Sequence, residues 1–502
     1  MAVGLRWNFA RASFVNPFMT GDRVATWILL GLAAATMVAH AFHGAAYGFH
    51  GDELQTMDDA RRLAWGYVTY PPMTPFFARL SLELFGTSIA GFRVFASLAQ
   101  AVTIVLTGLM AREMGGGARA QLLAGAALVP YAVGQGALMT YASFDNLCWV
   151  LAAFFAVKLL RSEDERWWVA IGAAVGFGMT AKYAIAFFAV AIVAGFLVTD
   201  ARRYLVSRWV WAGCAVAVLV WAPNLIWEVR HQFISLDFLS SIHARDISIG
   251  RAKTFLPEQI YQTIAPLWII GLIFCFKSAE GKRFRAVGWI YLAVFTELLV
   301  ARGRGYYLAA AYPMLYAAGS VWLEQRLVSG RRGSWRMALV TGGVAVGAVV
   351  AGVISLPVGP PRWPLHHPEV LDEVGWEDLV ATVASVRDAI PLEDRGRLAV
   401  LTGNYAAAGA IDFYGGQYGL PAAISRINSW GERGYGDPPP ETVIAFGFPR
   451  ELLENHFASC QLAAVNRNRY GVANRNSSQG VFVCRGLKED WPMFWAEIPR
   501  FG

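Results

Sequence analysis

Long apolar segments recur along the first 357 residues of the chain, and short loops rich in lysine and arginine separate them. A helix of roughly 20 apolar residues is long enough to cross a bilayer. The chain is 56% hydrophobic and only 16% charged, whereas soluble domains are typically about 25% charged. These features predict a polytopic membrane protein whose first domain is built from α-helices.

We expect about eleven membrane helices in this part of the chain. The segment 167–199 is open to two interpretations, one long span or a broken pair, and the loop charges favour the pair. The predicted spans are 24–43, 91–111, 118–138, 145–161, 167–180, 183–199, 208–227, 264–277, 286–301, 306–323 and 336–357.

With eleven spans, the basic residues of the N-terminus and of every second loop fall on one side of the membrane. Because positive loops stay in the cytoplasm, this side and the N-terminus are predicted to be cytoplasmic, in a bacterial inner membrane. The net charge of +7 then reflects membrane orientation and does not indicate nucleic-acid binding. The residues are Arg6, Arg11, Arg23, Arg112, Arg119, Lys158, Arg161, Arg166, Arg202, Arg203, Arg208, Lys277, Lys282, Arg283, Arg285, Arg326, Arg331, Arg332 and Arg336.

The chain changes character after a proline-rich linker that begins at Pro357. Short apolar runs at 398–402, 442–446 and 480–484 indicate strands, and residues 370–390 have helical spacing. We therefore divide the chain into a transmembrane domain (1–357) and a small α/β domain (358–502) on the external, periplasmic side. An oxidising compartment would favour a disulfide between Cys460 and Cys484, but spacing alone leaves the pairing open.

The first predicted external loop contains Asp52 and Glu53, followed by Tyr70 before a Pro-Pro pair. The prolines restrict the backbone and suit a preorganised site. Residues 54–66 are patterned as an amphipathic helix at the membrane interface, and we expect its charged residues to be solvated: Asp58, Asp59, Arg61 and Arg62.

Further polar residues lie at the external ends of predicted spans. Asp145 is either functional or an N-cap. Lys182, beside Tyr183, either snorkels or binds phosphate. Arg302 and Arg304, before Tyr306 and Tyr307, oppose the positive-inside bias and so suggest an anionic partner. In the loop 228–263, His231 is a weaker candidate. No pair has metal-ligand spacing.

Several short motifs, taken in order along the chain, resemble the GT-C glycosyltransferases. The chain is most similar to the branch that contains protein O-mannosyltransferases and lipid A aminoarabinose transferases. The motifs are His50-Gly51-Asp52-Glu53, Tyr70-Pro71-Pro72, Ser143-Phe144-Asp145, Thr180-Ala181-Lys182-Tyr183, Pro223-Asn224-Leu225-Ile226-Trp227, Tyr306-Tyr307-Leu308, Tyr312-Pro313-Met314, Gly403-Asn404-Tyr405 and Asp412-Phe413-Tyr414-Gly415.

This resemblance implies transfer of a sugar from a polyprenyl-phosphate carrier to a lipid, glycan or protein acceptor, with inversion at the anomeric carbon. It implies a general base at Asp52 assisted by Glu53, and a second carboxylate at Asp145. It places the leaving phosphate at Lys182, Arg302, Arg304, Tyr306 and Tyr307, and we add Tyr70, Tyr183 and His231 as substrate-binding residues. No cofactor is expected. Metal dependence stays open, and the absence of an Asp-x-Asp pair from the site argues against a metal.

One departure concerns the sugar. The aminoarabinose transferases have lysine before the Pro-Pro pair, where this chain has Tyr70. Two other classes compete with the transferase. A transporter or flippase of a lipid-linked anion predicts midplane charges and internal repeats, and Glu297 is the main such charge. A scaffold that presents the external domain would leave Asp52 and the cationic clusters without a role.

Overall fold

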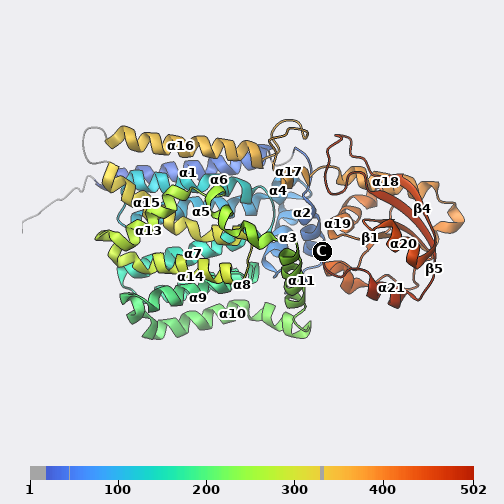
Figure 1. Cartoon of the computed structure of the whole chain (residues 1–502), viewed down its shortest axis with the longest axis horizontal. Helices are drawn as coiled ribbons and strands as arrows, with labels where there is room; N and C mark the ends of the chain where they lie inside the picture. Colours follow the sequence, from blue (N-terminus) through green and yellow to red (C-terminus); the bar gives the residue numbers. More distant parts are fainter. Residues whose placement is uncertain (1–17, 44–45, 328–332) are drawn as a thin grey trace, which may run out of the picture.

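The computed structural model describes residues 18–43, 46–327 and 333–502. Helices α1 to α16 form an elongated bundle, and the C-terminal residues form a separate α/β unit at one end of it (Figure 1). Arg6, Arg11, Arg331 and Arg332 of the predicted cytoplasmic loops lie outside the described residues.

Each of the eleven predicted spans corresponds to one helix of the bundle. These helices are α1 (Phe18–His43), α5 (Val94–Glu113), α6 (Ala118–Gly136), α7 (Tyr141–Ser162), α8 (Trp167–Ala181), α9 (Ile185–Leu197), α10 (Arg208–Arg230), α13 (Ala265–Lys277), α14 (Arg285–Val300), α15 (Tyr312–Leu327) and α16 (Gly333–Ser355).

The number of membrane crossings stays a prediction. Among the described residues, five helices are long and apolar enough to span a bilayer, or up to seven if each sharply bent pair is one span. The interpretation of 167–199 as a broken pair is confirmed, because α8 ends before Lys182, whose backbone is extended. The predicted span 306–323 begins as a 3₁₀ turn (Gly305–Ala311), and its α-helix starts only at Tyr312.

Loops that the charge pattern assigned to one side do meet at one end of the bundle. The Arg161 guanidinium donates to the carbonyl of Arg112 at 2.8 Å, and Arg283 donates to the carbonyl of Arg161 at 3.4 Å. Arg203 pairs with Glu163 at 3.1 Å. Three predicted cytoplasmic loops thus contact the loop that follows α7.

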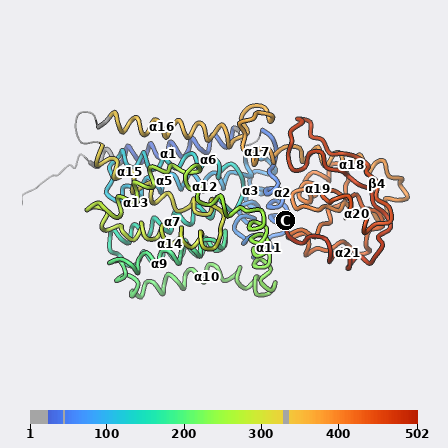
Figure 2. The backbone as a smooth tube through the Cα atoms, viewed as in Figure 1, coloured from blue at the N-terminus to red at the C-terminus, as the bar shows by residue number. Residues whose placement is uncertain are grey.

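The opposite end of the bundle carries short helices between the long ones and the C-terminal unit. Figure 2 shows α2 and α3 in this intermediate layer. The helices are α2 (Gly51–Arg61), α3 (Met73–Phe85), α4 (Ile89–Phe92), α11 (Ile234–Ser248) and α12 (Phe255–Tyr261).

The C-terminal unit is a five-stranded sheet in the order β2-β1-β3-β5-β4. Strand β1 pairs in parallel with β2 and β3, whereas β5 is antiparallel to both β3 and β4. Its elements are β1 (Leu398–Thr402), β2 (Ala423–Ile424), β3 (Thr442–Phe446), β4 (Phe457–Val465), β5 (Gly480–Leu487), α17 (Pro368–Leu371), α18 (Trp376–Ala389), α19 (Tyr405–Tyr414), α20 (Arg450–His456) and α21 (Trp491–Glu497).

Alternation along the strands gives this sheet two buried faces. Val443 and Ala445 of β3 pack with α20 and α21 on one face. Ile444 and Phe446 join α18, α19 and residues of α2 and α3 on the other face. Because one apolar cluster contains side chains from both parts of the chain, the sheet unit is fixed to the end of the bundle by its own core.

Three strands agree with the sequence prediction, but two features differ. Strands β2 and β4 were not predicted. The exposed, mixed side chains of β4 give no clear alternation because it is an edge strand. The expected helix 370–390 is divided into α17 and α18 by Gly375, whose φ of +91° a helix does not accommodate.

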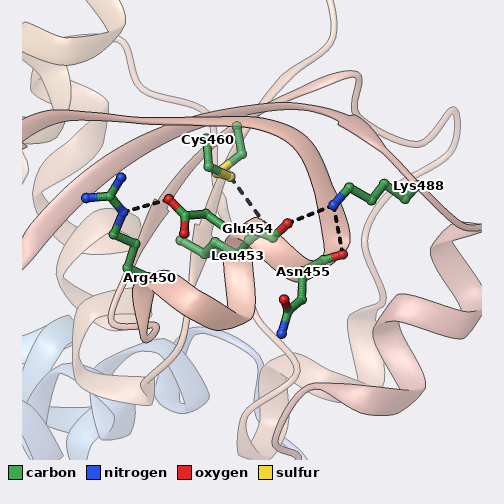
Figure 3. The surroundings of a disulfide bond; sticks show 7 residues. Arg450, Leu453, Glu454, Asn455, Cys460 and Lys488 are labelled. Carbon is green, nitrogen blue, oxygen red and sulfur yellow. Dashed lines mark hydrogen bonds and ion pairs between the residues drawn. A yellow bond between two sulfur atoms is a disulfide. The ribbon is translucent and has the colours of Figure 1, made fainter.

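Cys460 and Cys484 face each other on β4 and β5 and form a disulfide. Figure 3 shows the neighbouring helix α20, where Arg450 pairs with Glu454 at 2.6 Å. Lys488, just after β5, donates to the carbonyl oxygens of Glu454 at 2.8 Å and Asn455 at 3.2 Å. The disulfide therefore lies at an edge of the sheet that this ion pair and these hydrogen bonds also stabilise.

The predicted solvation of the acidic residues on α2 is wrong. Asp58 and Asp59 are only 3% and 1% exposed, because Arg433 of the α/β unit pairs with Asp58 and Tyr70 donates to Asp59. Arg61 and Arg62, at the end of the helix, are exposed as predicted.

Candidate active site

The start of α2 aims Asp52 into a cavity between the bundle and the C-terminal unit. The His50 ring accepts a hydrogen bond from the Asp52 N–H at 3.1 Å, and the Glu53 carboxylate accepts one from the His50 N–H at 2.9 Å. This reciprocal capping box orients the first turn, and it leaves the Asp52 side chain on the cavity wall.

Glu53 points the other way, into the protein. It is fully buried, and the Arg93 guanidinium donates to its two oxygens at 2.8 and 2.6 Å. The Met139 N–H donates to it at 2.9 Å. Burial alone would raise the pKa of Glu53, but Arg93 and these backbone donors lower it. Glu53 therefore ties the loop to α5 and to the α6–α7 turn, and it lies outside the cavity.

The cavity has a volume of about 320 Å³, which falls in the usual range for small-molecule sites. Residues from both parts of the chain line it. The C-terminal unit contributes Tyr405, whose hydroxyl donates to Asp52 Oδ1 at 2.7 Å. The other lining residues that matter here are Tyr70, Tyr141, Lys182, Tyr183, Arg245, Arg304 and Tyr307.

Lys182 provides a positive charge on the wall of the cavity. Its Nζ lies 3.9 Å from the ring centroid of Tyr307, 4.6 Å from that of Tyr141 and 5.4 Å from that of Tyr306. Cation–π contacts hold the ammonium in place. Among the described residues, no carboxylate lies within ion-pair distance of Lys182, so this charge is available to an anion.

Arg304 adds a second cation, already partly neutralised. It pairs with Asp246 of α11 through two hydrogen bonds of 2.5 and 3.1 Å, and it donates to the Tyr306 hydroxyl at 3.2 Å. Burial alone would raise the pKa of Asp246, but the pairing with Arg304 lowers it. Asp246 thus holds Arg304 toward the cavity, where Arg245 also lies.

Tyr70 and Tyr183 line the cavity with their hydroxyls directed to buried carboxylates. Tyr70 donates to Asp59 at 2.7 Å, and Tyr183 donates to Glu228 at 2.8 Å. These bonds fix both rings as walls of the cavity.

Asp145 lies on α7, one turn beyond the cavity residue Tyr141. It is 9% exposed, and Trp149 Nε1 donates to it at 3.0 Å. The alternative that it is an N-cap is wrong, because α7 begins at Tyr141 with Thr140 as its N-cap.

Five of the predicted site residues do not line the cavity: Glu53, Asp145, Arg302, Tyr306 and His231. Arg302 is exposed and has a positive φ of 50°. His231 is exposed at the end of α10, where its ring stacks on Trp227 at 4.0 Å. Among the described residues, the one three-ligand cluster that could hold a metal ion is His456, Glu489 and Glu497, and none of them lines the cavity.

Sequence reasoning placed Tyr405 in a family motif but missed its contact with Asp52. Its neighbour Asn404 is a clear N-cap that accepts the Ala407 N–H at 2.7 Å, so the start of α19 was recognisable. That this start meets Asp52, 353 positions away in sequence, had no local signal.

Residues 69–227 match the sequence model of the dolichyl-phosphate-mannose-protein mannosyltransferase family. ArnT from Cupriavidus metallidurans has a similar structure, both bound to undecaprenyl phosphate and in the apo state. Each of these two structures gives a TM-score of 0.63 at 15% sequence identity. The alignment covers 98% of each ArnT chain. It covers 91% of this chain for the bound structure and 92% for the apo structure. The chain therefore shares the fold of ArnT.

The similarity to ArnT supports the fold that the sequence motifs suggested. The matched region 69–227 contains Tyr70, Asp145, Lys182 and Tyr183. Asp52, Arg304 and Tyr405 lie outside it, and tertiary structure alone brings them to the same cavity. No curated protein sequence is detectably similar to the chain.

Proposed function

We propose that this protein is a GT-C glycosyltransferase, which transfers a sugar from a polyprenyl-phosphate carrier to an acceptor hydroxyl in the cavity at Asp52. The observation that carries the proposal is the composition of the cavity. It combines the Asp52 carboxylate with a positioned arginine and with Lys182, which has no carboxylate within ion-pair distance among the described residues. A transferase that uses a phosphate leaving group needs both kinds of group.

In the proposed reaction, Asp52 takes the proton of the acceptor O–H while the acceptor oxygen attacks the anomeric carbon. The bond from that carbon to the phosphate oxygen breaks, and the polyprenyl phosphate leaves with the electron pair. Lys182 and Arg304 stabilise the charge that develops on the phosphate. Tyr306 and Tyr307 hold the Lys182 ammonium. A single displacement of this kind inverts the anomeric centre.

An apolar groove beside the cavity supports a lipid-linked donor. The groove, of about 690 Å³, runs along α9 and α14. Phe187 of α9 lines both the groove and the cavity. A carrier whose phosphate lies at Lys182 would thus have an apolar path for the start of its chain at Phe187.

The structure supports revised roles for four predicted site residues. Glu53 positions the loop that carries Asp52. Asp145, close to Tyr141, supports the cationic wall from behind. Arg302 and His231 are not proposed to touch substrate. We further propose that the cavity and the α/β domain (358–502) face the periplasm, with a cytoplasmic N-terminus, and that the acceptor is a lipid, glycan or protein.

The test uses purified protein and a panel of radiolabelled polyprenyl-phosphate sugars, with native membranes as the source of acceptor. We expect Asp52→Asn to lower the transfer rate by about a hundredfold or more, because it removes the general base. Glu83→Gln, at an exposed carboxylate of α3, is the control and should leave the rate unchanged. The stereochemistry of the product reports whether the displacement inverts.

Two results would contradict the proposal. If Asp52→Asn turned over at the wild-type rate, Asp52 would not be the base. If no donor were used even with native membranes present, the transporter or flippase alternative would gain, and transbilayer movement of the same lipids would then be measured.

A further inference from the structure

A second large pocket lies at the other end of the bundle, far from the proposed active site. Its volume is about 710 Å³. It is formed where the loops that follow α7, α9 and α13 meet. Nothing in the proposed transfer reaction uses it.

The walls of this pocket are strongly cationic. Five basic side chains line it, against two acidic ones, Glu163 and Asp200. Glu163 is shared by Arg203 at 3.1 Å and Arg283 at 3.8 Å. In the part of the chain that the structure describes, the other three cations have no carboxylate within 4 Å: Arg202, Lys282 and Arg285. The pocket therefore keeps an excess of positive charge that fits an anion.

The pocket also has an apolar wall. Leu160, Leu197, Val198 and Trp289 line it, and Val198 and Trp289 continue into the apolar groove along α9 and α14. Basic loops alone would only set orientation in the membrane. A cationic pocket that opens into a lipid-facing apolar groove fits a molecule with an anionic head and a hydrocarbon chain.

We propose that this pocket binds the headgroup of an anionic phospholipid from the adjacent leaflet. The phosphate would contact Arg202, Lys282 and Arg285, and the first part of an acyl chain would lie against Val198 and Trp289. Because three loops contribute to the pocket, a bound lipid would hold the ends of α7, α9 and α13 together. This inference does not depend on the proposed transfer reaction.

The experiment measures lipid binding to the full-length purified protein by native mass spectrometry. Phosphatidylglycerol is the anionic probe and phosphatidylcholine is the neutral one. We expect the wild type to retain phosphatidylglycerol preferentially, and each of Arg202→Gln, Lys282→Gln and Arg285→Gln to weaken that binding by about fivefold. A triple variant should abolish the preference.

The matched control removes the same charge at the same end of the bundle but outside the pocket. It combines Arg119→Gln, Arg326→Gln and Arg336→Gln, and it should keep the preference for phosphatidylglycerol. Equal losses in the two triple variants would overturn the proposal, because they would indicate non-specific attraction. The single variants keep the test valid if the triple variant does not fold.

Two competitors distinguish other sources of the anion. Free inorganic phosphate should not displace phosphatidylglycerol at millimolar concentration, since it lacks a chain for the groove. Displacement of bound phosphatidylglycerol by inorganic phosphate would also overturn the assignment to a phospholipid. The same holds if polyprenyl phosphate displaced it at a lower concentration than added phosphatidylglycerol does.

Discussion

Asp52 and Glu53 are adjacent acids with opposite environments. Asp52 meets the cavity and the Tyr405 hydroxyl, whereas Glu53 is enclosed by Arg93 and backbone donors. Consecutive residues at a helix start project about 100° apart, since a turn holds 3.6 residues. One acid can therefore face substrate while its neighbour anchors the loop.

Tyr405 is the residue at which the α/β domain reaches the proposed base. A hydrogen bond to a charged group contributes about 1.5–3 kcal/mol. If it positions Asp52 for proton transfer, Tyr405→Phe should lower kcat by about tenfold or more with little change in the donor KM. Steady-state kinetics with varied donor concentration checks this split.

The control for this prediction is Tyr418→Phe. The Tyr418 ring packs against the same apolar cluster, and its hydroxyl has no hydrogen-bond partner among the described residues. The Tyr418→Phe variant should retain the full kcat. A rise in donor KM at unchanged kcat in Tyr405→Phe would instead indicate a role in donor binding.

The buried carboxyl of Asp59 leads us to expect that the stability of the protein depends on pH. Burial is the main cause that raises its pKa to about 7, and the nearby Asp58 adds to it. In the unfolded chain the pKa is about 3.9. Between about pH 3.9 and about pH 7, Asp59 loses its proton more readily in the unfolded state than in the folded one. The free energy of unfolding therefore falls as pH rises through this range, and the loss is complete above about pH 7.

We therefore expect Asp59→Asn to gain stability relative to wild type as pH increases. The amide stays neutral and can still accept the Tyr70 hydroxyl. Relative to its effect at pH 4, the substitution should be more favourable by roughly 2–4 kcal/mol at pH 8. Thermal unfolding in detergent at the two pH values measures this, and a pH-independent difference in Tm would contradict it.

At the scale of elements, α2 is the contact that joins the two parts of the chain. His50 at its start contacts Glu369 at 3.1 Å and Asp372 at 3.4 Å, in and just after α17. Burial alone would lower the pKa of His50, but these carboxylates and Asp52 raise it to about 9. His50 thus links the cavity helix to the α/β domain through Glu369 and Asp372.

The close approach of α2 and α19 depends on Gly409. A Cβ added there would lie 2.7 Å from the backbone carbon of Leu54, a clash that no side-chain rotation relieves. We expect Gly409→Val to separate the helices, to destabilise the protein by about 1–3 kcal/mol, and to reduce transfer because Tyr405 moves from Asp52. Thermal unfolding and the transfer assay are the measurements.

Gly416 supplies the comparison, because an added Cβ there meets nothing within 4 Å. Gly416→Ala should leave both stability and transfer near wild type. If Gly409→Val behaved in the same way, close packing of α2 and α19 would not be what holds the cavity together.

At the scale of the whole molecule, the proposed topology places the cavity and the α/β domain on one side and the cationic pocket on the other. Single cysteines test it in a background without Cys148, Cys214 and Cys275. An impermeant maleimide should label Gly416→Cys in cells with a permeabilised outer membrane. It should label Lys282→Cys only after the inner membrane is opened. Labelling of both positions while the inner membrane is still closed would contradict the topology.

Sequence determined those features that local physics controls. Apolar length predicted the eleven helices, loop charge predicted which loops gather at one end, and short apolar runs predicted β1, β3 and β5. The lone cation at Lys182 and the acid at Asp52 also stood out, because charged residues are costly beside apolar spans.

Only the tertiary structure decided which of those residues share a cavity. The burial of Asp58 and Asp59, the pairing of Arg304 with Asp246, and the contact from Tyr405 to Asp52 all join segments far apart in the chain. Such contacts depend on how α19 and α11 pack against α2 and the bundle. Packing of this kind arises from the complementarity of whole surfaces, and no periodicity or motif in a single segment encodes it.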